Sequence, residues 1–183
     1  MDRAAHFSMA DIDIFYINLA RAEERRRAIE ESFANAKLPP TWRLNRFEAV
    51  NAASSEVQDR AGPIIPTLKA NWLSHIGCAK AALQQGLTSH ILISEDDTAF
   101  GECTGMMDRV LDLLPADSWD VIYLDVFIPN ALDMAWYFKL RQKCFREARI
   151  ELLQPTQVGR AFAGAGAYIV NNASLKSFLA LTD

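Results

Sequence analysis

Residues 11–19 read DIDIFYINL, and this stretch sets the fold class of the chain. It alternates at first between acidic and apolar residues and then becomes continuously apolar up to Asn18. Such a run predicts a central β-strand that is buried on both faces, as the strands of parallel sheets are. The charged segment 20–37 follows, with Ile29 and Phe33 four residues apart, and this spacing predicts an amphipathic helix.

The same alternation of short apolar runs and amphipathic segments continues along the rest of the chain. The predicted strands are 44–50, 90–94, 120–124 (buried) and 163–170, the predicted helices are 69–85, 105–114 and 172–181, and the less regular segments are 51–66 and 129–155. Strands that alternate with helices predict an α/β fold, an α/β/α sandwich around a mostly parallel sheet. Because no linker or repeat interrupts the pattern, we expect residues 1–183 to form a single domain.

The composition is that of a globular protein with 183 residues, half of them hydrophobic, and a formal net charge of −4. This mild acidity argues against general nucleic-acid binding, which needs a basic surface. No segment reaches the ~20 apolar residues that a transmembrane helix needs, and residues 1–10 lack the apolar region of a secretory signal. The three cysteines are widely spaced, which fits a reducing compartment better than a disulfide framework or a zinc site. We therefore expect a cytoplasmic protein.

Polar residues follow three of the predicted strands. Ligands of such sheets bind at the carboxyl ends of the strands, where this sequence places Asn18, Glu95-Asp96-Asp97 and Asp125. Three consecutive carboxylates repel one another unless a cation neutralises them, and Mg²⁺ and Mn²⁺ prefer oxygen ligands. In an extended chain, Glu95 and Asp97 would point to the same side and could reach one ion. The triplet thus predicts a metal site, and the alternative is that one acid caps a helix while the others are solvated.

Four segments, spread in order over nearly the whole chain, carry a resemblance to a known family. They are Tyr16-Ile17-Asn18-Leu19 with Arg21 and Arg25, then Phe47-Glu48-Ala49-Val50-Asn51, then Leu73-Ser74-His75-Ile76 followed by Ile93-Ser94-Glu95-Asp96-Asp97, and last Trp119-Asp120-Val121-Ile122-Tyr123-Leu124 with Gly164-Ala165-Gly166-Ala167-Tyr168-Ile169-Val170. The chain resembles glycosyltransferase family 25, the family of lipopolysaccharide-type and collagen galactosyltransferases. Set against that family, the chain is expected to be short at its C-terminal end.

The resemblance implies a GT-A-like fold, a UDP-sugar donor (usually UDP-galactose), a Mn²⁺ or Mg²⁺ ion and a glycan or glycolipid acceptor. It implies that Glu95, Asp96 and Asp97 are the metal residues. The donor-binding residues would then be Asn18, Arg21, Arg25, Ala49, Val50, Ser74 and Tyr168, and the catalytic residues Asp125 and His75. The ion would bridge the donor's phosphates, and a carboxylate base such as Asp125 would take the proton of the acceptor hydroxyl.

Each of these side chains also has a structural interpretation. Arg21 and Arg25, four residues apart on one predicted helix face, fit a diphosphate or simply a solvated helix surface. Asn18 could hydrogen-bond a nucleotide or cap the following helix. His75 could orient an acid of the triplet, contact a phosphate or complete the core, and Tyr168 could line a sugar pocket or pack in the core.

The function expected from these features is transfer of a hexose, most simply galactose, from a UDP-sugar to a sugar hydroxyl of a lipopolysaccharide-type glycan. A nucleotide-sugar-binding module or partner subunit without transfer activity is the alternative, and metal-assisted phosphoryl chemistry ranks third. Trp136 to Arg149 is locally basic and aromatic, which suits peripheral contact with the inner membrane face. For that segment we favour an exposed strand or hairpin with alternating, solvated charges.

Overall fold

A computed structural model describes residues 10–101, 107, 110–112, 114–115, 117–147, 149, 151–153 and 163–181. Its centre is a five-stranded sheet in the order β2-β1-β3-β5-β4. The strands are β1 (Ile12–Asn18), β2 (Trp42–Glu48), β3 (His90–Glu95), β4 (Val121–Phe127) and β5 (Ala163–Val170). The helices are α1 (Glu23–Asn35), α2 (Ser55–Gln58), α3 (Pro66–Gln84), α5 (Ala131–Arg146), the short 3₁₀ helix η1 (Asn172–Ser174) and α7 (Leu175–Ala180).

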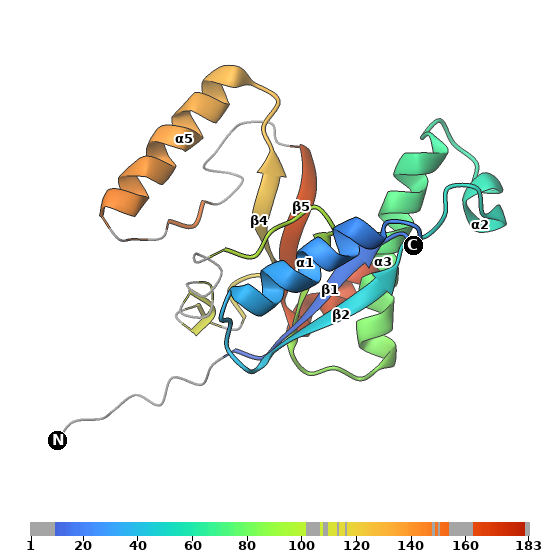
Figure 1. Ribbon diagram of the computed structural model, residues 1–183, viewed down its shortest axis with the longest axis horizontal. Coiled ribbons are helices and arrows are strands. Elements are labelled where there is room, and N and C mark those ends of the chain that lie inside the picture. The colour runs from blue at the N-terminus through green and yellow to red at the C-terminus, as the bar shows by residue number, and fades with distance from the viewer. Residues whose placement is uncertain are drawn as a thin grey trace.

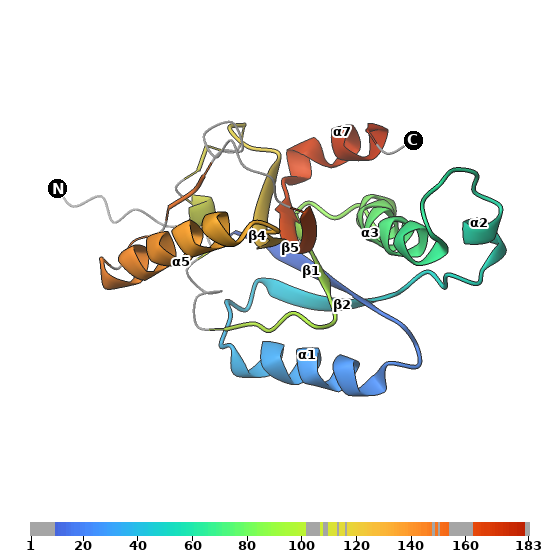
Figure 2. The same ribbon diagram turned by 90° about the horizontal axis from the view of Figure 1, so that it is seen from above.

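The sheet is mixed, with a parallel centre. β1 pairs in parallel with both β2 and β3, whereas β5 runs antiparallel to β3 and to β4. Helices lie on both faces: α1 is on one side, and α3 and α7 are on the other (Figure 2). The α/β class, with parallel strands at the centre, is therefore confirmed, and β5 is the strand that departs from the parallel arrangement.

β1 is the centre of the core, as its sequence predicts. All seven of its residues are buried, because the strand lies between β2 and β3 and is covered by helices on both faces. Ile14 and Tyr16 pack with Ile29 of α1, whereas Phe15 and Ile17 pack with residues of α3. The alternation of side chains along a strand divides the core into these two layers.

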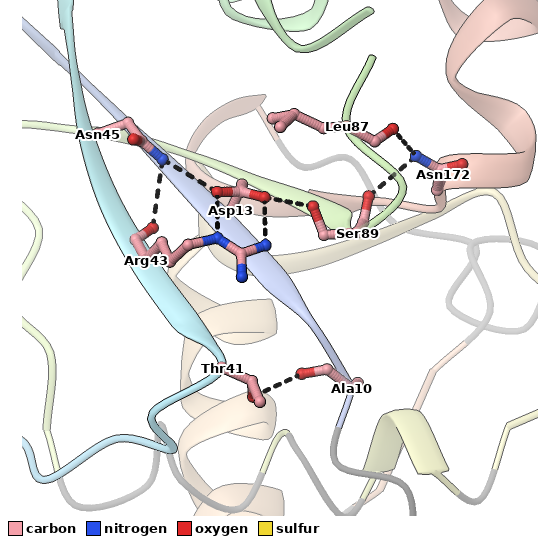
Figure 3. A network of polar contacts seen from close by, with 8 residues as sticks. All are labelled: Ala10, Asp13, Thr41, Arg43, Asn45, Leu87, Ser89 and Asn172. Carbon is pink, nitrogen blue, oxygen red and sulfur yellow. Dashed lines mark hydrogen bonds and ion pairs between the residues drawn. The ribbon is translucent and has the colours of Figure 1, made fainter. Parts of the chain in front are cut away.

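Asp13 is the buried acid of β1, and it is the hub of a polar network at the amino ends of the strands (Figure 3). Arg43 of β2 donates two hydrogen bonds to it, from Nε to Oδ1 at 2.9 Å and from Nη2 to Oδ2 at 2.7 Å. Asn45 donates a third at 3.3 Å, and the Ser89 hydroxyl donates a fourth. These partners, Arg43 foremost, hold the pKa of Asp13 below its usual value although burial opposes them.

Two expectations about β4 and the segment after it are wrong. β4 is an edge strand and is half exposed rather than buried, since only β5 pairs with it and Phe127 is 66% exposed. Residues 131–146 form the helix α5 rather than an irregular segment or a strand, and the Asn130 side chain caps its first turn. Figure 1 shows α5 standing apart from α1 and α3.

The remaining elements follow the predictions closely. β5 has the predicted bounds, and β2, β3, α1, α3 and α7 shift by a few residues at one or both ends. Arg21 lies in a turn before α1 rather than on its first turn. The helix predicted at 105–114 falls largely outside the described residues. Within the described part of the chain, no helix is long and apolar enough to cross a membrane.

Candidate functional site

A cavity of about 220 Å³ lies at the carboxyl ends of β1 and β3. Its lining comes from the ends of β1 and β3, the loops that follow β1, β2 and β3, the first turn of α1 and one side of the first half of α3. The lining residues are Ile17, Leu19, Arg21, Arg25, Ala49, Val50, Asn51, Ala52, Thr67, Ala70, Asn71, Ser74, Glu95 and Asp96. This is the position where ligands bind in open sheets with parallel strands.

The parallel register brings the polar strand ends together. Asn18 pairs with Glu48 of β2, and Ile17 pairs with Glu95 of β3, so the three strands end at the same level. Asn18 and Glu95, 77 positions apart in the sequence, therefore lie at one edge of the sheet. The prediction that polar residues after buried strands meet at one edge of the sheet therefore holds for β1 and β3.

On the α1 side of the cavity, the buried Asp96 carboxylate contacts the guanidinium of Arg25 and the side-chain amide of Asn18. Arg25 contacts its Oδ1 at 2.9 Å, and Asn18 Nδ2 donates to its Oδ2 at 2.7 Å. Arg46 of β2 donates from Nε to Asn18 Oδ1 at 3.2 Å, which directs the amide NH₂ of Asn18 towards Asp96. The guanidinium of Arg25 thus neutralises the middle acid of the triplet.

Arg25 still has hydrogen-bonding capacity towards the cavity. Its side chain is 52% exposed, and its contact with Asp96 is made through one terminal nitrogen. A guanidinium has five N–H donors in a planar fork, so several of them stay available to an anion. Arg21 lines the same cavity from the turn that precedes α1. Two arginines therefore contribute to one wall, although they do not share a helix face.

On the α3 side of the cavity, Glu95 is held by two residues of the helix. Asn71 donates to its Oε1 at 3.1 Å, and His75 Nε2 lies 3.7 Å from the same oxygen. The contact with His75, assisted by Asn71, holds the pKa of Glu95 below its usual value, although partial burial opposes it. Glu95 therefore presents an ionised carboxylate to the cavity at neutral pH.

His75 is itself held from behind by Tyr168 of β5. The Tyr168 hydroxyl lies 3.1 Å from His75 Nδ1, and the two rings stack with centroids 5.6 Å apart. Burial raises the pKa of Tyr168, so the hydroxyl keeps its proton. A chain of contacts thus runs from the core through His75 to Glu95, and of the roles expected for His75 the geometry matches the one that orients an acid of the triplet.

Ser74 fixes the loop after β2 by means of its hydroxyl group. Its Oγ donates to the carbonyl of Ala70 at 2.8 Å and accepts from the backbone N–H of Val50 at 2.9 Å. The N–H of Ala49 donates to the carbonyl of Asn18 at 3.1 Å. These bonds position the loop wall of the cavity, so the hydroxyl proton of Ser74 is already used within the protein.

The predicted site residues fall into three groups. Seven of them line the cavity: Arg21, Arg25, Ala49, Val50, Ser74, Glu95 and Asp96. Three lie behind the lining and hold it: Asn18, His75 and Tyr168. The other two, Asp97 and Asp125, are exposed and do not line the cavity.

Asp125 lies within β4 rather than at its end, which corrects its predicted position. It pairs in register with Ala167 of β5, which in turn pairs with Ser94 of β3, so β5 separates Asp125 from the cavity edge. Its carboxylate packs against Gly166, where an added Cβ would lie 2.7 Å from Oδ2. A catalytic role for Asp125 stays a prediction.

The acidic triplet is not extended as the sequence argument assumed. A turn begins at Glu95, closed by a hydrogen bond from the Thr98 N–H to the Glu95 carbonyl at 3.3 Å. Asp96 then points into the protein and Asp97 is exposed. Within the described residues, no group of three or more His, Cys, Asp or Glu side chains is placed to hold a metal ion. Since Asp96 is already bound by Arg25 and Asn18, Glu95 and Asp97 are the acids of the triplet that remain for a cation.

Sequence reasoning missed two residues that support the site. Asn71 lies one helical turn before His75, so the i, i+4 spacing was a signal that both contact the same acid. Arg46 pairs in register with Tyr16 of β1 and reaches Asn18, the next residue of β1 on that face. Only the register of the strands reveals this second contact.

A scan against protein-family models and a search of curated protein sequences gave no match for this chain. The geometry of the cavity and the motifs in the sequence are therefore the features that bear on the function of the chain.

Proposed function

We propose that the cavity binds the nucleoside diphosphate of a UDP-sugar and that the chain is a GT-A-type glycosyltransferase. In this proposal it transfers a hexose, most simply galactose, to a sugar hydroxyl of a lipopolysaccharide-type glycan. The observation that carries the proposal is that Arg21, Arg25 and Glu95 face one cavity at the carboxyl edge of the parallel strands. The similarity of its segments to glycosyltransferase family 25 supports the same conclusion.

The two arginines are suited to a diphosphate. Guanidinium groups bind phosphate oxygens in a bidentate manner, and Arg25 keeps N–H donors free of its contact with Asp96. Asp96 and Asn18 hold the Arg25 side chain at the cavity wall, which lowers the entropic cost of ordering it on binding. Residues 49–52 line the same cavity and offer apolar surface to the nucleoside.

A divalent cation fits the donor set in part. Glu95 and Asp97 would hold it together with the donor's phosphates, since Mg²⁺ and Mn²⁺ use one or two carboxylates in such sites. When bound, the ion would neutralise negative charge on the departing nucleoside diphosphate. His75 and Asn71 would keep the Glu95 carboxylate ionised and oriented.

A second function, donor binding without transfer, is favoured by one observation. The side chains suited to the donor converge on the cavity, whereas Asp125, the expected base, lies across β5 from it. A module that binds a UDP-sugar needs the first set of residues only. Transfer needs, in addition, a base close to the acceptor hydroxyl.

Calorimetric titration with UDP and UDP-galactose, with and without Mn²⁺, tests both proposals. We expect both ligands to bind, and Mn²⁺ to tighten binding in the unmodified chain but not in the Asp97→Ala variant. Asp59→Ala removes an exposed acid that does not line the cavity and is the matched control.

Release of UDP in the presence of a lipooligosaccharide acceptor then separates transferase from binding module. UDP binding without sugar transfer to any acceptor supports the module. If neither UDP nor UDP-galactose binds, both proposals are wrong.

A further inference from the structure

The helix α5 has an unusual surface for a globular protein. None of its 16 residues is buried, and its large apolar side chains are exposed, with Leu132 at 80% and Phe138 and Phe145 at 56% each. Phe127, at the end of the preceding strand, is also exposed. Exposed apolar side chains gathered in this way mark interaction surfaces.

The side chains of α5 form three sectors around the helix. Residues Asp133, Tyr137, Leu140 and Cys144, spaced four, three and four apart, are half-buried and make the inner side. Met134, Phe138 and Phe145 have a matching spacing and make an exposed apolar stripe. Arg141 lies beside Phe138 and Phe145 on this stripe. Lys139, Lys143 and Arg146 make the third sector, next to the stripe, where Leu132 and Trp136 are also exposed.

We propose that α5 is an interfacial helix that binds the surface of an anionic membrane. In such helices an apolar stripe enters the boundary between headgroups and acyl chains, while flanking lysines and arginines reach up to the lipid phosphates. α5 carries four basic residues and one acidic residue in a chain whose net charge is −4. An anionic surface therefore attracts α5 and repels the rest of the protein, which fixes the orientation of binding.

A second copy of the chain fits this surface less well. In a two-fold contact the same helix face meets itself, so its basic residues would face basic residues. Lipid phosphates are complementary to those residues. Arg141 also lies over the ring of Phe145, at 5.4 Å from its centroid, so a cation and an apolar ring occupy the same place on the stripe. That pairing suits the boundary layer of a membrane, where apolar and charged groups meet.

Co-sedimentation of the whole chain with lipid vesicles tests the proposal. We expect binding to vesicles of equal parts phosphatidylglycerol and phosphatidylcholine and none to phosphatidylcholine alone. Raising the salt concentration from about 0.1 M to 1 M should release the protein, because salt screens the attraction. Equal binding to both kinds of vesicle, or binding that salt does not weaken, would overturn the proposal.

Paired variants locate the binding surface. Lys139→Gln/Lys143→Gln should weaken binding about 30-fold, at about tenfold for every 1.4 kcal/mol and about 1 kcal/mol per cation. Phe138→Ser/Phe145→Ser should weaken it at least tenfold. The controls Lys37→Gln/Lys176→Gln and Ile64→Ser/Leu68→Ser change equally exposed residues away from α5 and should bind as the unmodified chain does.

Two further outcomes would overturn the proposal. Undiminished vesicle binding by both α5 variants overturns the proposal. So does a dimer that forms without lipid and that Phe138→Ser/Phe145→Ser dissociates, together with no binding to either kind of vesicle. Because the measurement needs neither UDP nor an acceptor, its failure would leave the proposed glycosyltransferase function untouched.

Discussion

The two ends of β1 carry similar polar groups with different consequences. At the amino end, buried Asp13 contacts Arg43, and at the carboxyl end, buried Asp96 contacts Arg25. The distances, 2.7 and 2.9 Å, and the exposure of the two arginines, 51% and 52%, are nearly equal. An ion pair between a buried aspartate and a half-exposed arginine therefore does not by itself indicate a functional site.

The difference lies in what each cluster leaves unused. Asp13 receives four hydrogen bonds, two of them from Arg43, whose fork is occupied by the carboxylate (Figure 3). Arg25 contacts Asp96 through one nitrogen and faces a cavity with its other donors. A carboxylate whose oxygens accept four hydrogen bonds holds neighbouring strands together, whereas an arginine whose donors face a cavity can bind a ligand.

The largest expected effect is on stability, and it comes from the cluster around Asp13. Asp13→Ala should lower the free energy of unfolding by about 3 kcal/mol, because Arg43, Ser89 and Asn45 lose a charged acceptor that is buried. Urea unfolding measures the change, with Asp59→Ala as the exposed control. UDP affinity should stay unchanged in the folded Asp13→Ala protein, and a loss of affinity without a loss of stability would contradict the distinction between the two ends.

A somewhat smaller effect, on binding instead of stability, is expected at the other end. Arg25→Gln should weaken UDP binding about 10- to 100-fold, since charge-assisted hydrogen bonds contribute about 1.5–3 kcal/mol. Calorimetry measures the affinity, and urea unfolding should show a cost of about 1 kcal/mol from the lost Asp96 contact. The control is Arg27→Gln, which changes another exposed arginine of α1. Equal UDP affinity in both variants would remove Arg25 from the binding site.

The smallest effect is a dependence of stability on pH that comes from Asp13. Because its pKa in the folded protein is lowered, the folded state binds this proton less readily than the unfolded chain does. The stabilisation is therefore complete above the usual aspartate pKa of about 4 and is lost as the pH falls through the lower folded value. Unfolding measured from pH 7 downward should show a flatter acid slope in Asp13→Asn than in the unmodified chain. Identical slopes would show that Asp13 does not cause this dependence of stability on pH.

Much of the fold follows from local sequence patterns. Buried strands such as β1 and β3 read as continuous apolar runs, and α1 and α3 read from their charged and apolar periodicity, so their positions are predicted within a few residues. β4 and α5 were misjudged for a physical reason. The residues DVIYL look the same whether a strand has one neighbour or two. α5 has no buried residue, so its sequence lacks the wide apolar face of a helix that packs on a core.

The candidate site was predictable in outline but not in its contacts. Polar residues after buried strands pointed to the correct edge of the sheet, and seven predicted residues line its cavity. The placement of Asp96 and Asp97 was wrong because a turn, which the run of three acids does not reveal, begins at Glu95. Asp125 was misplaced because the length of β4 depends on its pairing with β5.

The sequence by itself determined most of the strands and helices, with α5 as the exception, together with the burial of β1 and the edge of the sheet that is polar. These properties depend on neighbours along the chain, through periodicity and burial. Only the tertiary structure decided that Arg25 neutralises Asp96, that Arg46 orients Asn18 and that Tyr168 supports His75. Those contacts join residues 28 to 93 positions apart, and they exist because strand register and helix packing bring distant side chains within hydrogen-bonding distance.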